Sequence, residues 1–111
     1  MIDFNKVWKS MKTNKKSKRS IEELYYKEID KNEFIIIDVR SRREFKETHL
    51  NGAINIPLPE VKRNIEKFVK DRQKKILVCC EYGVRSKQAA EIIENLGYTQ
   101  VYNLKGGLEN I

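Results

Sequence analysis

Cysteine and histidine are scarce in this sequence, and their scarcity limits the chemistry that the chain can support. Two cysteines and one histidine occur among the 111 residues. Cys79 and Cys80 are adjacent. They cannot join distant segments, so a reducing compartment is the simpler setting for them. No set of cysteine and histidine has the spacing of metal ligands, so we predict no metal and no cofactor.

Long apolar runs are also missing. No stretch is long enough to span a membrane, and no apolar signal segment stands near the N-terminus. The sequence has no internal repeat, and its length suits one domain with a single core. We therefore expect a cytoplasmic protein without a membrane span, while its oligomeric state stays unknown from the sequence.

Acidic residues are nearly absent from the first part of the chain. Residues 1–20 hold seven Lys/Arg and one acid, whereas the remainder holds 16 basic and 15 acidic residues. Such a segment suits an acidic partner, but it lacks the interleaved aromatics of a single-strand binder, so we do not expect nucleic acid. We divide the chain into a basic segment over 1–19, comprising a short amphipathic helix and a polar linker, and a domain over 20–111.

Strand and helix patterns alternate along this domain, which predicts an α/β fold with a mainly parallel sheet. Apolar, β-branched runs predict strands over 34–39, 53–56, 76–80 and 101–104. Helical spacing and capping residues predict helices over 20–30, 41–45, 60–69 and 86–96. A capping box of Ser20 and Glu23 predicts the start of the first helix, and one of Ser41 and Glu44 predicts the start of the second. In the third we expect Phe68 to face inward.

The most informative stretch joins a strand to a helix through a short loop that begins with a cysteine. A loop that closes onto a helix N-terminus points backbone N–H groups and the positive end of the helix dipole at whatever sits there. A thiol in that position is shifted toward its thiolate form. Gly83 permits a tight loop. Because successive strand residues face opposite sides, Cys79 and Cys80 cannot both face one pocket.

Four motifs follow one another along the domain. They are Asp38-Val39-Arg40, then Gly52-Ala53-Ile54-Asn55-Ile56-Pro57 preceded by His49, then Cys80-Glu81-Tyr82-Gly83-Val84-Arg85-Ser86, and finally Leu104-Lys105-Gly106-Gly107. In this order, and over about residues 20–107, they resemble the motifs of the single-domain rhodanese family. The resemblance implies a rhodanese-like α/β fold, with a central sheet of about five strands and helices on both faces. It also implies a sulfurtransferase of the thiosulfate sulfurtransferase type.

The resemblance further implies a division of roles among the residues. Cys80 is the expected catalytic residue. It carries sulfur as a persulfide from thiosulfate, a persulfide or a polysulfide to a thiol or another nucleophilic acceptor, either a small molecule or a protein. The expected substrate-binding loop consists of Glu81, Tyr82, Gly83, Val84, Arg85 and Ser86. Asp38 and Arg40 are expected to support the site.

The residues around this loop have different expected roles. Asp38 is expected to pair with Arg85 and to hold the loop in shape. Arg40 either lines the pocket or is solvated, and the sequence does not favour one of these. His49 is expected to make a local hydrogen bond and to play no catalytic part. Glu81 departs from the basic residue that the resembling family often carries in this loop, so its charge should repel a dianion such as thiosulfate.

Two other functions stay open at this point. The spacing Cys79-x5-Arg85-Ser86 matches the signature of Cys-dependent phosphatases and arsenate reductases. Only one cysteine can face the pocket, so this interpretation and the persulfide interpretation exclude each other. In the favoured one, Cys79 is structural, with a resolving thiol for Cys80 as the alternative. The domain could also be a non-catalytic binding module.

Overall fold

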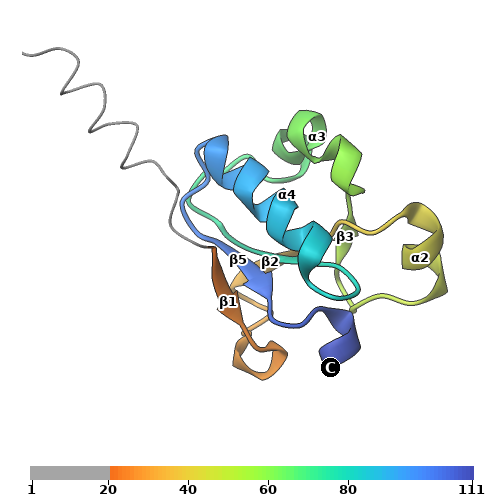
Figure 1. Cartoon of the computed structure of the whole chain (residues 1–111). Coiled ribbons are helices and arrows are strands. Elements are labelled where there is room, and N and C mark those ends of the chain that lie inside the picture. The colour runs from red at the N-terminus through yellow and green to blue at the C-terminus, as the bar shows by residue number, and fades with distance from the viewer. Residues whose placement is uncertain (1–20) are drawn as a thin grey trace, which may run out of the picture.

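A computed structural model describes residues 21–111, and the short helix and linker predicted in the N-terminal segment lie outside the described residues. Within this range a five-stranded parallel sheet has the order β1-β5-β4-β2-β3 (Figure 1). The strands are β1 (Glu22–Leu24), β2 (Phe34–Asp38), β3 (Ile54–Asn55), β4 (Lys75–Cys79) and β5 (Val101–Leu104). The helices are α2 (Arg42–Glu47), α3 (Val61–Phe68) and α4 (Val84–Asn95), with the 3-10 helices η1 (Tyr26–Glu28), η2 (Leu58–Glu60) and η3 (Leu108–Asn110).

The sheet is centred on β4, which pairs with β5 on one side and β2 on the other. Apolar residues fill these strands because both faces of a parallel sheet are buried. In the register of the ladder, Asp38 at the end of β2 lies opposite Cys79 at the end of β4. The predicted α/β fold with a mainly parallel sheet of about five strands is confirmed. Its topology brings the segments that follow β2, β4 and β5 to one edge of the sheet.

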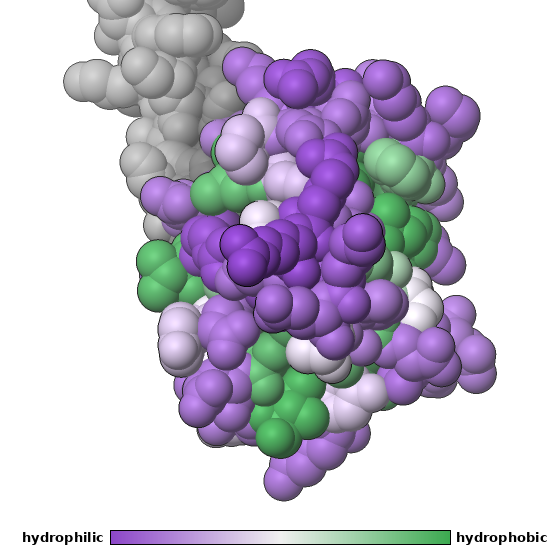
Figure 2. Space-filling model, turned by 90° about the vertical axis from the view of Figure 1, so that its right-hand side faces the viewer, coloured by the Kyte–Doolittle hydropathy of each residue, from purple (hydrophilic) through white to green (hydrophobic). Residues whose placement is uncertain are grey.

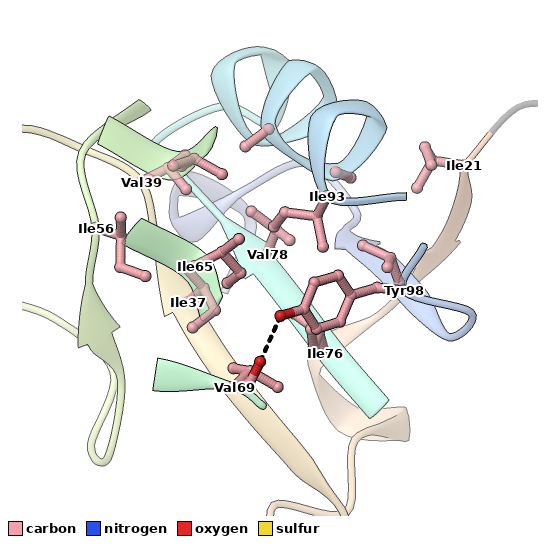
Figure 3. Close-up of a cluster of buried hydrophobic side chains, with 14 of the residues drawn as sticks. Ile21, Ile37, Val39, Ile56, Ile65, Val69, Ile76, Val78, Ile93 and Tyr98 are labelled. Atoms are coloured by element: carbon pink, nitrogen blue, oxygen red, sulfur yellow. Dashed lines mark hydrogen bonds between the residues drawn. The ribbon is translucent and has the colours of Figure 1, made fainter. Parts of the chain in front are cut away.

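The two faces of the sheet have different covers. Figure 1 shows α3 and α4 on one side, where Ile65 of α3 and Ile93 of α4 join Val78 of β4 in the larger core cluster. Figure 3 shows this cluster, including the hydrogen bond that the hydroxyl of Tyr98 donates to the carbonyl of Val69. The opposite face is covered more thinly, by side chains from η1, η3 and the segment before β3.

The helix predicted over 20–30 is wrong. Glu22–Leu24 is a strand that pairs in parallel with Tyr102–Leu104 of β5, and a short 3-10 helix follows it. Ile21, just before the strand, is buried in the larger core cluster. The ladder with β5 and this burial outweigh the local preference for a helix, because tertiary context overrides intrinsic propensity.

The other predicted helices are present. Ser41 caps α2 through a capping box, since its Oγ accepts the N–H of Glu44 at 3.2 Å and its own N–H donates to the Glu44 carboxylate at 3.0 Å. The prediction that Phe68 faces inward is wrong, because its side chain is 49% exposed. The helix ends at Phe68, and the extended backbone of Val69 turns the next side chain into the core instead. No helix within 21–111 is long and apolar enough to cross a membrane.

Candidate active site

Cys80 stands at the carboxyl end of β4, where the chain turns into α4. Its Sγ accepts hydrogen bonds from the backbone N–H groups of Gly83, at 3.1 Å, and Ser86, at 3.3 Å. Its thiol also lies 3.3 Å from the hydroxyl of Ser86, to which it donates. Cys80 is only 1% exposed. The sulfur is therefore enclosed by the loop and held by polar groups rather than by apolar packing alone.

The conformation of Gly83 gives the loop its shape. Gly83 is the N-cap of α4 and has a φ of 95°, in the left-handed region that side chains other than glycine rarely adopt. The turn at this residue brings the first turn of a 12-residue helix over the sulfur. A negative charge on Sγ would be favoured there by the helix dipole and by both N–H donors, because charge-assisted hydrogen bonds are stronger than neutral ones.

The segment from Gly107 to Glu109, which follows β5, supports the loop from outside. The N–H of Leu108 donates to the carbonyl of Cys80 at 2.8 Å, and the N–H of Glu109 donates to the carbonyl of Glu81 at 2.9 Å. A Cβ on Gly107 would lie 2.4 Å from the Glu81 carbonyl oxygen, so only glycine fits there. The loop carbonyls are bound on this outer side, while the N–H groups of Gly83 and Ser86 face the sulfur.

Asn103 is a site residue that sequence reasoning missed. The buried hydroxyl of Ser86 donates to Oδ1 of Asn103 at 2.5 Å, and Nδ2 of Asn103 donates to the carbonyl of Gly83 at 3.1 Å. Because Gly83 offers an acceptor and Ser86 a donor, the Asn103 amide has one favourable orientation. Its signal in the sequence is a single amide residue within the largely apolar strand β5. That signal is weaker than the four motifs, so Asn103 was not identified from the sequence.

The hypothesis that Asp38 pairs with Arg85 is wrong. Asp38 binds Arg40 instead, with Nη2 of the guanidinium 2.8 Å from Oδ2 of the carboxylate, and the Arg40 N–H also donates to Asp38. Arg40 donates as well to the carbonyl of Thr48 at 2.7 Å and is 3% exposed. The alternative that the Arg40 side chain is solvated is therefore excluded. The two residues stand two positions apart at the end of β2, which makes their pairing local.

Arg85 is held by a carboxylate from another element. Its two terminal nitrogens donate to the two oxygens of Glu44 in α2 at 2.8 and 3.0 Å. These hydrogen bonds, together with that from the Ser41 N–H, lower the pKa of Glu44 to about 2. The same pair raises the pKa of Arg85, and the nearby charge of an ionised Cys80 acts in the same direction. Glu44 thus caps α2 and positions Arg85 at once.

The other predicted loop residues lie at the surface around the sulfur. Tyr82 is 66% exposed and Val84 is 69% exposed. The carboxylate of Glu81 is 3.8 Å from Nη1 of Arg40. Figure 2, which faces the α2 side of the molecule, shows a mostly hydrophilic surface with separate hydrophobic patches.

Cys79 and His49 take the places that the sequence predicted for them. Cys79 packs with Ile36 and Leu77 in the second core cluster, on the face of the sheet opposite Cys80, and neither cysteine is in a disulfide. Burial raises the pKa of the Cys79 thiol, which keeps it protonated. His49 makes its local hydrogen bond at 2.6 Å from Nδ1 to the carbonyl of Phe45, whose ring it stacks on.

Comparison with known proteins agrees with this geometry. The family model for the rhodanese-like domain matches residues 22–111. The thiosulfate sulfurtransferase PspE of Escherichia coli is 47% identical over 75 residues, which cover 68% of this chain and 71% of that protein. The thiosulfate sulfurtransferase GlpE of Coxiella burnetii is 31% identical over 81 residues, covering 73% and 74% of the two chains.

Solved structures show the same fold. A rhodanese with anions from E. coli superposes with a TM-score of 0.66 at 45% identity, covering 70% of this chain and 91% of that chain. The reduced CoADR-RHD of Bacillus anthracis superposes with a TM-score of 0.71 at 35% identity, and the match covers 80% of this chain but 16% of that chain. The chain belongs to the rhodanese-like domain family, and it is a sulfurtransferase-like enzyme.

Proposed function

We propose that Cys80 carries sulfane sulfur as a persulfide and transfers it to a thiol. The observation that carries this proposal is the pair of backbone N–H groups, from Gly83 and Ser86, that donate to Sγ of Cys80. A persulfide carrier is an anion before it takes up sulfur and again afterwards. Fixed N–H donors and a helix N-terminus stabilise both anions without a general base.

In the first step, the Cys80 thiolate attacks the sulfane sulfur of the donor. A new S–S bond forms to Sγ, and the S–S bond of the donor breaks with its electron pair on the departing group, which is sulfite from thiosulfate or a thiolate from an organic persulfide. In the second step, an acceptor thiolate attacks the outer sulfur, takes it away as a persulfide and restores the Cys80 thiolate. Atoms and charge balance in both steps without an outside oxidant.

The remaining residues hold this reaction in place. Asn103 and Gly107 maintain the loop from the side and from outside. Arg85 stands near the sulfur in a position set by Glu44, whose carboxylate compensates its charge. PspE and GlpE are both named thiosulfate sulfurtransferases, so thiosulfate is one donor to test. The exposed side chains of Tyr82 and Val84 give a protein or small-molecule thiol an apolar rim to approach.

Phosphatase chemistry through Cys79 has less support. A phosphate-binding loop would need Cys79 and the guanidinium of Arg85 to face one oxyanion. Cys79 instead packs in the second core cluster, and Arg85 is bound by the carboxylate of Glu44. The binding-module interpretation leaves the N–H donors around Cys80 without a purpose, so sulfur transfer accounts for more of the site.

Intact-protein mass spectrometry tests the proposal. Wild type, Cys79→Ser and Cys80→Ser are each incubated with thiosulfate and, separately, with an alkyl persulfide. We expect the mass of one sulfur atom to be gained by wild type and Cys79→Ser, to be lost again on addition of a thiol, and to be absent from Cys80→Ser. Sulfur gain that survives in Cys80→Ser, or no gain from either donor in wild type, would overturn it.

A further inference from the structure

Both arginines beside the catalytic loop have their charge compensated by carboxylates. Arg85 makes two hydrogen bonds to Glu44, at 2.8 and 3.0 Å. Arg40 is bound to Asp38 at 2.8 Å and lies 3.8 Å from Glu81. These five side chains carry two positive and three negative charges when ionised. A donor that approaches Cys80 past them therefore meets a slightly negative group rather than a cationic binding site.

These charges are close enough to the sulfur to act on a donor. Glu81 follows Cys80 directly in the chain, and Asp38 lies opposite Cys79 in the ladder. The charge of an ionised Cys80 contributes to the raised pKa of Arg85, so the two side chains lie near each other. Glu44 binds the guanidinium of Arg85 directly and is therefore also near the sulfur. Glu44, whose pKa is lowered to about 2, is ionised at neutral pH.

We propose that Glu44 and Glu81 determine donor specificity by electrostatic exclusion, so that the site prefers sulfur donors of low negative charge over dianions. The favoured class is organic persulfides and thiosulfonates, and the disfavoured one is inorganic thiosulfate. This inference rests on the proposed sulfur transfer by Cys80, and it concerns only which donor delivers the sulfur.

The Coulomb energy of a donor in a fixed field is proportional to its charge. If neutralising one carboxylate raises the rate for a monoanion by some factor, it raises the rate for a dianion by the square of that factor. A change of about threefold for a monoanion corresponds to about tenfold for a dianion. The ratio of the two rates isolates the charge effect, because changes in the loop or in the thiolate population affect both donors.

Thiosulfate and methanethiosulfonate are a matched pair of probes for this ratio. Methanethiosulfonate has a methyl group where thiosulfate has one oxygen, so it carries one negative charge fewer and has a similar size. In both reactions the thiolate of Cys80 takes the terminal sulfur and the S–S bond of the donor breaks. The electron pair leaves on sulfite in one case and on methanesulfinate in the other.

The experiment compares kcat/KM for both donors in four proteins: wild type, Glu44→Gln, Glu81→Gln and Glu66→Gln. Glutamine at position 44 can still accept the Ser41 N–H, so α2 keeps its cap. Glu66→Gln is the matched control. It removes a carboxylate from the Arg72–Glu66 ion pair, next to the segment that enters β4 at the opposite end of the strand.

We expect wild type to favour methanethiosulfonate. Glu44→Gln and Glu81→Gln should each raise kcat/KM by about tenfold for thiosulfate and by about threefold for methanethiosulfonate, while Glu66→Gln leaves the ratio unchanged. Added salt should raise the thiosulfate rate of wild type, because it screens repulsion beyond about 10 Å at 0.1 M. A ratio unaltered in both site variants, or altered equally in Glu66→Gln, would overturn the inference.

Failure of the inference and failure of the proposed function are distinguishable in the same experiment. If Cys80 forms its persulfide with both donors and the ratio does not respond to either carboxylate, sulfur transfer stands and electrostatic exclusion is refuted. If no persulfide forms on Cys80 with either donor in any of the four proteins, the proposed function itself is refuted and the inference goes with it.

Discussion

Cys79 and Cys80 are adjacent and almost fully buried, yet their surroundings have little in common. The Cys79 side chain packs among Ile36, Leu77 and Leu104 on one face of the sheet, where burial raises its pKa. The Cys80 side chain, on the other face, receives N–H groups from Gly83 and Ser86. Equal burial thus encloses one thiol among apolar side chains and places the other against two backbone N–H groups. What separates them is the supply of hydrogen-bond donors, not access to water.

The donors around Cys80 depend on parts of the chain that are distant in sequence. Asn103 from β5 binds the Gly83 carbonyl, and the segment after Gly107 binds the carbonyls of Cys80 and Glu81. The Cys79 side chain packs instead with the apolar side chains of the second core cluster. The difference between the two cysteines therefore arises from what the folded chain places against each face of β4.

Replacing each cysteine in turn tests this comparison most directly. We expect Cys80→Ser to lower sulfur transfer at least about 1,000-fold, because the proposed nucleophile is lost. Cys79→Ala should retain turnover within about threefold and lose about 1–2 kcal/mol of unfolding free energy, through the cavity it leaves. Steady-state assays and urea denaturation measure the two effects. A Cys79→Ala variant as inactive as Cys80→Ser would place the nucleophile on the other face.

Substituting Gly107 should disturb the Cys80 side of the sheet alone. The added Cβ of Gly107→Ala would meet the Glu81 carbonyl oxygen at 2.4 Å, so the loop must shift. We expect a fall in turnover of about 100-fold, as for a displacement of about 1 Å in a reacting group, and a loss of about 2–3 kcal/mol in stability.

Gly52→Ala is the control for that substitution. Gly52 also has a positive φ, of 86°, but nothing lies within 4 Å of the Cβ it would gain. We expect it to cost about 1–2 kcal/mol in stability and to leave turnover unchanged. If both glycine variants lost activity equally, the contact between Gly107 and the loop would have no special part in the site.

Removing the amide of Asn103 should sharpen the comparison further. Asn103→Ala leaves the Gly83 carbonyl and the Ser86 hydroxyl without their buried partner. We expect turnover to fall about tenfold and stability to fall by about 1–3 kcal/mol, as for buried polar groups that lose a hydrogen bond. Tyr102→Phe, its neighbour packed in the second cluster, should change turnover by less than about twofold. An effect on turnover in Tyr102→Phe of the same size would contradict the separation of the two faces.

The smallest effect is expected from the pH dependence of the Glu44–Arg85 pair. The pKa of Glu44 is lowered from 4.5 to about 2, so the pair stabilises the folded state above pH 4.5, and that stability is lost as the pH falls toward 2. Urea denaturation should show wild type more stable than Glu44→Gln at pH 7, with the difference shrinking below pH 4.5. A difference that persists at pH 2 would assign it to packing rather than to charge.

Local pattern was sufficient for much of the fold. The apolar runs of β2, β4 and β5 and the capping box of Ser41 and Glu44 involve residues close in sequence, and each was predicted. The helix predicted over 20–30 failed because its Ser20–Glu23 signal was also local, whereas the strand that formed there depends on pairing with β5. The prediction that Phe68 faces inward was wrong because the helical periodicity did not show where α3 ends.

The sequence by itself determined the position of Cys80 at the end of a buried strand, the opposite orientation of Cys79, and the glycine that lets the loop close. Strand alternation and backbone stereochemistry set all three within a few residues. Only the tertiary structure decided which carboxylate holds Arg85, which side chain orients Ser86, and what Gly107 contacts. Arg85 and Glu44 are 41 positions apart. Partners at such separations depend on which strand ends meet at one edge of the sheet, and the local spacing of residues does not predict which ends these are.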